Sequence, residues 1–495
     1  MTTEESRAFE LAQASLSPDL AMTALPAVET ALRGNPSSAR LWRVMGLLLR
    51  ELDRRREALD ALERAAALAP QRPKIAWALA QTRFEAGLDS VDAFAWALQL
   101  NPNTPEIILG LSDALLAEGR SAEAIAGLDI IVERSPGWVA GHELLARIRW
   151  MDGERQGFAR SFDRALDAEP RNFDLRRAQL ITLLHANHFD ETLAAIGNGR
   201  RVLGPVPLIE VNEAIVRAEM GQLALAEQLF APYAELDDIS VQVRRVRMLL
   251  RAGRPAEAVA IHDRYADHEE AFHLVPYLAS ALRMLGNPRW ETLEGDPSLV
   301  GIYDLADRLP PLGDLAERIR AVHRARGQQL EQSVRGGTQT EGDLLMHIDP
   351  FIVAATAVIR ETVAQHTSAL SPADAAHPTL SAPRGRPVRF AGSWSVRLAS
   401  GGHHSNHVHP MGWLSSAMYI VLPDAMGGVR KAGWLTLGEP PRELGLDLAP
   451  FRTIEPRPGR LVLFPSTMWH GTVPFEGTGP RTERLAMAFD VARPV

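Results

Sequence analysis

Five prolines recur at a nearly constant interval through the first third of the chain. Pro36, Pro70, Pro102, Pro136 and Pro170 are separated by 34, 32, 34 and 34 residues. Proline lacks a backbone N–H and clashes with the preceding helical turn, so this spacing predicts a helix end once in every unit. A unit of this length can hold two helices, and it buries its apolar face only by stacking on its neighbours. The chain is therefore predicted to begin with a stack of helical hairpins.

The residues between these prolines repeat as well. Small residues occupy the positions where paired helices must approach closely, and leucine and phenylalanine fill the gaps between them. The pattern consists of Trp42, Met45, Gly46, Leu49, Ala58, Leu62 and Ala65, and then of Leu111, Ser112, Ala124, Leu128, Leu145, Ala146, Phe162 and Ala165. Over roughly residues 5 to 200 the chain resembles the tetratricopeptide-repeat family. Gly221 and Gly253 occupy comparable turns further on, which extends the predicted all-α tetratricopeptide solenoid over residues 1–285.

Such a solenoid leaves a concave face on which other molecules can bind. The resemblance implies a peptide or protein partner on this face. The alternative interpretation is a passive spacer, or an element through which the chain forms a homodimer. A fold of this kind does not by itself assign a ligand.

Length, charge and cysteine content limit the class of protein. A chain of 495 residues exceeds what one core organises, so we expect two or three domains. A net charge of −8 without a basic stripe argues against a nucleic-acid partner. The N-terminal residues lack the apolar core of a signal peptide, and no apolar run reaches membrane-spanning length, so we expect a cytoplasmic protein with no membrane partner. The absence of cysteine means that any metal must be held by nitrogen and oxygen ligands.

The helical period fails after residue 285. Prolines interrupt residues 286–343, which we interpret as a connecting segment, and residues 335–340 (RGGTQT) are expected to form a turn. Residues 344–370 carry apolar side chains at helical spacing and predict a helix that backs the next domain. From Phe390 the period becomes two, with short strands expected at 393–398, 414–422, 433–438, 460–465, 470–475 and 484–491. Residues 344–495 therefore predict an antiparallel barrel or jelly roll, and the whole chain an α + β multidomain protein.

Three histidines stand out in this predicted β domain. His407 and His409 are two residues apart, so on a strand both imidazoles point to the same face. His470 follows the predicted strand at 460–465, where a barrel could bring it to the first two. His403 and His404 are flanked by glycine and by Ser405, and we expect them to be solvated loop residues. The pattern predicts a metal site formed by His407, His409 and His470.

An arginine on the last predicted strand is a candidate for binding an acidic molecule in the same pocket. Arg484 shares its strand face with two alanines, Ala486 and Ala488, which leave room for a ligand beside the guanidinium. Arg481 lies nearer to His470 but in a turn, so we rank it second. Ser395 and Arg397, with Ser393, are expected to face the interior from the first strand. Trp394, Trp413 and Tyr419 are further candidates for the pocket wall or the core.

Together these segments carry a second resemblance. Residues 335–495 resemble the 2OG-Fe(II) oxygenases that bacteria and phages carry behind tetratricopeptide repeats, through RGGTQT, SWSVRL, HVHPMGWLSS, RLVLFPSTMWHGTVPF and ERLAMAFDV. The resemblance implies a double-stranded β-helix (jelly-roll or cupin-like) fold. It also implies Fe(II), 2-oxoglutarate and O2 as reactants, with succinate and CO2 as products beside an oxidised substrate. Arg484, Ser395 and Arg397 would then bind 2-oxoglutarate.

The chain departs from the usual pattern of this family at one position. The family pattern is His-x-Asp/Glu followed by a distant His, and His409 replaces the carboxylate. Either all three histidines bind iron, or His407 and His470 do so alone, as in the aspartyl/asparaginyl β-hydroxylase branch, with His409 acting beside the metal. The expected substrate is a peptide or protein side chain, with a small molecule as the alternative. A non-catalytic scaffold with a cupin-like barrel and a hydrolytic zinc enzyme are the rival interpretations.

Overall fold

The computed structural model describes residues 18–324, 327, 330, 333–424, 426, 431–477 and 482–494. Contacts between residues divide the chain into two compact units that do not follow chain order. The first contains residues 1–126, 317–325 and 340–356, and the second contains residues 127–316, 326–339 and 357–495. The boundaries that the sequence suggests at residues 285 and 343 stay a prediction. No helix among the described residues is both long enough and apolar enough to cross a membrane.

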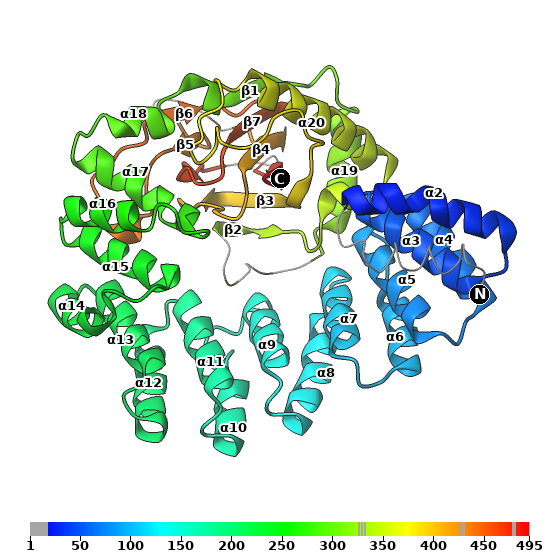
Figure 1. Ribbon diagram of the computed structural model, residues 1–495, viewed down its shortest axis with the longest axis horizontal. Coiled ribbons are helices and arrows are strands. Elements are labelled where there is room, and N and C mark those ends of the chain that lie inside the picture. The colour runs from blue at the N-terminus through cyan, green and yellow to red at the C-terminus, as the bar shows by residue number, and fades with distance from the viewer. Residues whose placement is uncertain are drawn as a thin grey trace. The chain divides into compact units, whose positions relative to one another are not determined.

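Helices follow one another from Pro18 to Glu294 and form an α-solenoid, as predicted (Figure 1). They are α2 (Pro18–Gly34), α3 (Ala39–Glu51), α4 (Arg55–Leu68), α5 (Pro73–Glu85), α6 (Val91–Leu100), α7 (Pro105–Ala117), α8 (Ser121–Arg134), α9 (Val139–Met151), α10 (Arg160–Ala168), α11 (Phe173–His185), α12 (Phe189–Leu203), α13 (Pro207–Glu219), α14 (Leu223–Phe230), α15 (Ile239–Arg251), α16 (Pro255–Arg264), α17 (Val275–Met284) and α18 (Arg289–Glu294). Short 3-10 turns η1 (Ala231–Tyr233), η2 (Ala271–His273) and η3 (Pro297–Leu299) interrupt or follow the later repeats.

The local sequence explains where these helices begin and end. Each of the five recurring prolines lies two residues beyond the end of a second helix, as in Pro70 after Leu68. Proline also occupies the first helical position of α5, α7 and α13, where its missing N–H would have no partner in any case. Gly221 and Gly253 adopt positive φ angles of 80° and 72° in the turns that we predicted. Period and turn chemistry together therefore account for the solenoid.

The rest of the chain forms two antiparallel sheets and a few helices. The strands are β1 (Gly301–Asp304), β2 (Val334–Gln339), β3 (Phe390–His404), β4 (Leu414–Val421), β5 (Leu435–Leu437), β6 (Arg452–Ile454), β7 (Arg460–Pro465), β8 (His470–Thr472) and β9 (Arg484–Val491). The helical elements are α19 (Leu312–Val322), η4 (Leu344–Met346), α20 (Pro350–Ala369) and η5 (Arg442–Leu444). The larger sheet has the order β1-β7-β4-β9-β3-β2 and the smaller one β6-β5-β8.

One apolar core lies between the two sheets. It contains Tyr419 of β4, Leu437 of β5, Phe464 of β7 and Ala486 of β9, all buried. Side chains from both sheets therefore meet in one core.

The expected turn at residues 335–340 is wrong, because β2 covers most of it. Gly336 has a φ of +69° at a bulge in the pairing of β2 with β3. A Cβ at Gly337 would lie 2.4 Å from the carbonyl oxygen of Arg397, so only glycine lets the two strands approach this closely. The glycines that suggest a turn instead shape an edge strand.

Helix α17, near the end of the solenoid, packs directly against the β region within the second unit. Trp469, which precedes His470, is buried against Tyr277 of α17 with ring centroids 5.5 Å apart. Its indole N–H lies within hydrogen-bond distance of the carbonyl oxygen of Pro276 (2.9 Å) and the hydroxyl of Ser280 (3.1 Å). Arg283 of α17 donates to the carbonyl oxygen of Gly438. The last helices of the solenoid and the β region therefore share one core.

Candidate metal centre

The three predicted histidines converge. The candidate ligand nitrogens of His407, His409 and His470 all lie within 4.8 Å of one another. The strand expected at His407 and His409 is wrong, because both residues lie between β3 and β4. His407 instead pairs with His470 through a single β-bridge, with backbone N···O distances of 2.9 and 3.0 Å in the two directions. The backbone N–H of His409 donates to the carbonyl oxygen of Ser466 at 2.9 Å. Backbone pairing therefore holds all three residues in place.

Each of these imidazoles has its Nδ1 beside an acceptor. The Nδ1 of His407 lies 2.9 Å from the carbonyl oxygen of Ser405, and the Nδ1 of His470 lies 3.0 Å from that of Met468. The Nδ1 of His409 lies 2.9 and 2.8 Å from the two carboxylate oxygens of Asp490. A carbonyl or carboxylate oxygen can only accept, so Nδ1 carries the proton in all three rings. The three Nε2 atoms are therefore available as lone-pair donors.

Their surroundings keep the imidazoles of His407 and His470 neutral. Burial lowers the pKa of His407 well below its usual value, and the neighbouring His470 and His409 lower it further. Burial likewise lowers the pKa of His470, with a further contribution from His409. Neutral imidazole is the form that binds a metal ion.

Asp490 is a residue that the sequence analysis missed. It lies on β9, and besides His409 it accepts a hydrogen bond of 2.6 Å from the hydroxyl of Ser415. Ser415 in turn lies 2.9 Å from the hydroxyl of Ser466. Asp490 has the same strand parity as Arg484, so extending the alternation along β9 would have found it. A carboxylate on the far nitrogen orients the ring and raises its basicity.

His403 and His404 both belong to β3 rather than to a loop, contrary to expectation, and His404 is not a solvated residue. It ends β3, lines the same pocket as the three histidines, and stacks on His407 with ring centroids 6.0 Å apart. The hydroxyl of Ser333 lies 3.0 Å from the Nδ1 of His404 and 3.1 Å from the Nε2 of His407. Burial lowers the pKa of His404 to about 3, and the charge of Arg484 adds to this effect. His404 is therefore a neutral wall of the pocket.

Arg484 lies in the pocket with the histidines. Its side chain is buried, and the hydrogen bond that its guanidinium makes with a described residue goes to the carbonyl oxygen of Gly433 at 3.0 Å. The guanidinium carbon lies 5.0 Å from the ring centroid of Tyr419. The hydroxyl of Tyr419 is buried and has no hydrogen-bond partner among the described residues. A buried cation that pairs with no described carboxylate, beside a hydroxyl without a described partner, fits an absent anionic ligand.

Ser395 and Arg397 do not face this pocket. Ser395 is buried and donates to the carbonyl oxygen of Ala486 at 2.9 Å, whereas Arg397 is exposed and pairs with Glu483 at 2.5 Å. Trp394 and Val396, of the opposite parity, line the pocket instead. The predicted interior face of β3 is therefore wrong. Both faces of this strand are buried around Ser395, so alternation alone cannot identify the inner one.

Two other predicted residues lie elsewhere. Arg481 falls outside the described residues. Trp413 is buried, but its indole donates to the carbonyl oxygen of Thr379 at 2.9 Å, and its ring lines a different cavity.

Comparison with known families agrees with this geometry. Residues 392–490 match a family described as "Putative 2OG-Fe(II) oxygenase", and residues 78–148 match a family described as tetratricopeptide repeat. The chain carries tetratricopeptide repeats and a 2OG-Fe(II) oxygenase domain. No curated protein sequence matches the chain significantly.

Solved structures that resemble parts of the chain include a tetratricopeptide repeat protein from Parabacteroides merdae, yeast Tom70 and a prolyl-4-hydroxylase from Pseudomonas putida. The first is 16% identical, covers 49% of this chain and 98% of that chain, and has a TM-score of 0.31. Tom70 is 16% identical over 57% of this chain and 61% of that chain, with a TM-score of 0.37. The hydroxylase is 16% identical over 45% of this chain and 100% of that chain, with a TM-score of 0.27.

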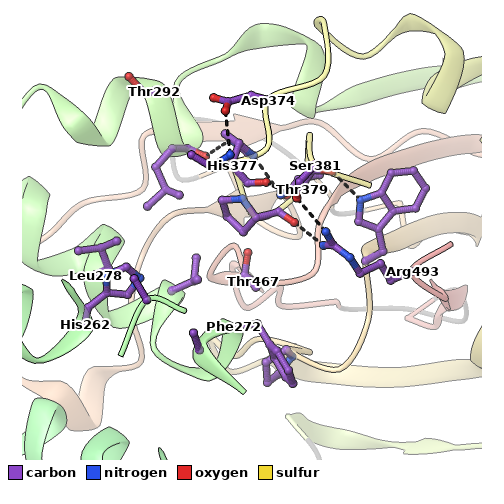
Figure 2. A pocket seen from close by; sticks show the side chains of 18 of the residues that line it. His262, Phe272, Leu278, Thr292, Asp374, His377, Thr379, Ser381, Thr467 and Arg493 are labelled. Atoms are coloured by element: carbon purple, nitrogen blue, oxygen red, sulfur yellow. Dashed lines mark hydrogen bonds between the residues drawn. The ribbon is translucent and has the colours of Figure 1, made fainter. Parts of the chain in front are cut away.

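The oxygenase domain borders a second cavity of about 770 Å³ (Figure 2). Its lining, which includes Met411 and His377, shares no residue with the lining of the histidine pocket. Arg493 donates to the carbonyl oxygen of Pro378 at 2.6 Å and to the hydroxyl of Ser381 at 2.8 Å. The Nδ1 of His377 accepts from the backbone N–H of Thr379 at 3.0 Å. These polar groups are engaged with one another, so they give no indication of a ligand.

Proposed function

We propose that the chain is an Fe(II)- and 2-oxoglutarate-dependent oxygenase in which His407, His409 and His470 bind the metal. The observation that carries this proposal is the convergence of the three rings with every Nδ1 beside an acceptor. Nitrogen donors of this kind suit iron, and three ligands leave other coordination positions open. Asp490 supplies through His409 part of the negative charge that the family usually places on the metal directly.

We further propose that the two sheets form a double-stranded β-helix. The isolated bridge between His407 and His470 of β8 supports this proposal, because it would extend the smaller sheet to the order His407, β8, β5 and β6. Successive segments of the chain would then alternate between the two sheets. The larger sheet contains β3, β4, β7 and β9, and the smaller one contains His407, the pair β5 and β6, and β8, which follow in turn between them. The shared core between the sheets supports this arrangement.

Arg484 would bind the carboxylate of 2-oxoglutarate that lies far from the metal, with the hydroxyl of Tyr419 as a second donor. Arginine suits this task because its planar fork matches a carboxylate. Ala486 and Ala488 line the pocket beside it and leave space for the ligand chain. When bound, iron and 2-oxoglutarate supply the oxidising chemistry, and the protein supplies orientation and a dry cavity. Phe464, buried with its ring centroid 4.7 Å from that of His470, is part of the apolar wall that excludes water.

The substrate we propose is a side chain of a peptide or protein that the repeats recruit. The repeats support this choice because a solenoid offers an extended surface suited to a chain rather than to a small molecule.

The test is formation of succinate from 2-oxoglutarate by the purified full-length chain supplied with Fe(II). His407→Ala and His470→Ala should abolish metal binding and succinate formation. His403→Ala is the matched control, because His403 lies next to the site yet does not line its pocket. Full activity in either His407→Ala or His470→Ala would refute the ligand assignment.

A further inference from the structure

A third cavity, of about 720 Å³, lies along the later repeats. It is lined by the ends of α11 and α13, by the start of α12, by α15, and by the η5 turn of the oxygenase domain. Helices α11, α13 and α15 are the first helices of consecutive repeats and contact one another in that order. The cavity shares no lining residue with the histidine pocket. We call it the arginine groove.

Positive charge dominates the arginine groove. Arg244, Arg247 and Arg251 occur at positions i, i+3 and i+7 of α15, and so share one helix face. Arg442 of η5 adds a fourth guanidinium from the oxygenase domain. The carboxylates in the lining are Glu219 and Glu443. The described lining therefore holds an excess of positive charge in a chain whose net charge is −8.

Two of the four arginines already form ion pairs within the protein. Glu219 pairs with Arg247 at 2.9 Å and with Arg251 at 2.9 Å. The guanidinium groups of Arg244, which is half-buried, and of Arg442, which is exposed, make in contrast no hydrogen bond or ion pair with any residue that the structure describes. Arg244 is only partly exposed, and burial together with the charge of Arg247 lowers its pKa. An arginine in such surroundings normally has a partner, so its free guanidinium indicates an absent anion.

The groove also has an apolar side and a connection to the metal centre. Leu184, Phe189 and Ile215 line it beside the arginines. The segment that precedes η5 is bonded to residues next to two metal ligands. The amide of Asn406, beside His407, donates to the carbonyl oxygen of Pro440 at 3.2 Å, and the backbone N–H of Gly438 donates to the carbonyl oxygen of Trp469 at 2.7 Å.

We propose that the arginine groove binds a segment of a peptide that carries carboxylates next to an apolar residue. Arg244 and Arg442 would bind the carboxylates, and Leu184 and Phe189 would contact the apolar side chain. Charge-assisted pairs between guanidinium and carboxylate are stronger than neutral hydrogen bonds, which favours an acidic segment over a neutral one. The inference deepens the proposed function, on which it rests, by assigning an acidic sequence to the recruited substrate.

The test is fluorescence anisotropy with a labelled peptide of sequence Glu-Leu-Glu-Asp-Leu-Glu, blocked at both ends. A peptide with glutamine and asparagine in place of the acids is the neutral probe, and the same acidic peptide with a free C-terminus shows whether a terminal carboxylate adds affinity. Arg244→Gln and Arg442→Gln should each weaken binding of the acidic peptide by roughly tenfold or more. Affinity should also fall as salt is raised. Arg264→Gln is the control, because Arg264 is exposed and paired with Glu235 outside the groove.

Wild-type affinity in the Arg244→Gln and Arg442→Gln variants would overturn the proposal, as would equal affinity for the neutral peptide. Displacement of the peptide by an equimolar amount of inorganic phosphate would overturn it too, because the groove would then bind small anions only. Neither arginine has a described partner, so their removal should leave the thermal unfolding of the chain unchanged. Binding is also measured in His407→Ala, where it should persist. Failure of the oxygenase assignment and failure of the groove assignment are thereby distinguished.

Discussion

Replacement of Asp490 by asparagine should weaken metal binding without disturbing the fold. Asparagine has the same shape and can still accept a hydrogen bond from the Nδ1 of His409, but it carries no charge. A hydrogen bond to a charged group contributes about 1.5–3 kcal/mol and a neutral one about 0.5–1.5 kcal/mol. The difference of about 1–1.5 kcal/mol corresponds to a loss of roughly tenfold in affinity, at the lower end of the 10–100-fold range typical of residues that orient metal ligands.

The assay is anaerobic titration of the metal-free chain with Co(II), whose visible absorption reports the coordination of nitrogen ligands, followed by competition with Fe(II). Asp304→Asn is the matched control, because Asp304 is an exposed carboxylate on β1 whose partner is Arg460. Its metal affinity should equal that of the wild type. If Asp490→Asn also binds metal within twofold of the wild type, while His409→Ala loses no affinity, His409 is not a ligand and the three-histidine site is wrong.

Three further perturbations test other parts of the structure. Arg484→Met should raise the KM for 2-oxoglutarate by about 10–100-fold, because a buried charge-assisted pair is lost. An unchanged KM in the succinate assay would show that Arg484 does not bind 2-oxoglutarate. Gly46→Ala should lower the free energy of unfolding by about 1–3 kcal/mol, because its Cβ would lie 2.5 Å from the Cγ of Leu62, whereas Gly127→Ala, in open space on a helix, should raise it by up to about 1 kcal/mol. Burial lowers the pKa of His366 to about 4. The unfolded chain therefore binds the proton more readily, and the free energy of unfolding should fall by about 1.4 kcal/mol for each unit by which the pH is lowered from about 6.5 to 4. His366→Phe should flatten this part of the pH dependence of thermal unfolding. An unchanged slope would contradict the lowered pKa of His366.

The solenoid is predictable because two independent signals agree. The proline interval gives the period, and small residues such as Gly46 and Ala58 occur where the packing of helix pairs requires them. Gly46 is required because the side chain of Leu62 occupies the space that a Cβ at this position would need. Errors of a few residues at helix ends do not change such a pattern.

The β region is harder to predict because some of its strands are very short and because β3 is buried on both faces. Strands β1 and β6 contain four and three residues, too few for alternation to be recognised. In β3, Ser395 and Val396 are both buried, so neither parity identifies the pocket. The histidines are predictable in number and spacing. The Nδ1 partners are not, because two of them are backbone carbonyl oxygens, which every residue carries.

The contact of Trp469 with α17 has a practical consequence for anyone who dissects the chain. A fragment that starts at residue 286 would hold every candidate metal ligand, yet it would lack the surface on which Trp469, Leu444 and Val408 rest. Those side chains would then face water, one of them immediately before His470 and another between His407 and His409. We expect such a fragment to aggregate or to bind iron poorly. The part of the chain that holds the candidate metal ligands therefore depends on α17, and joining it to other repeats would require keeping α17.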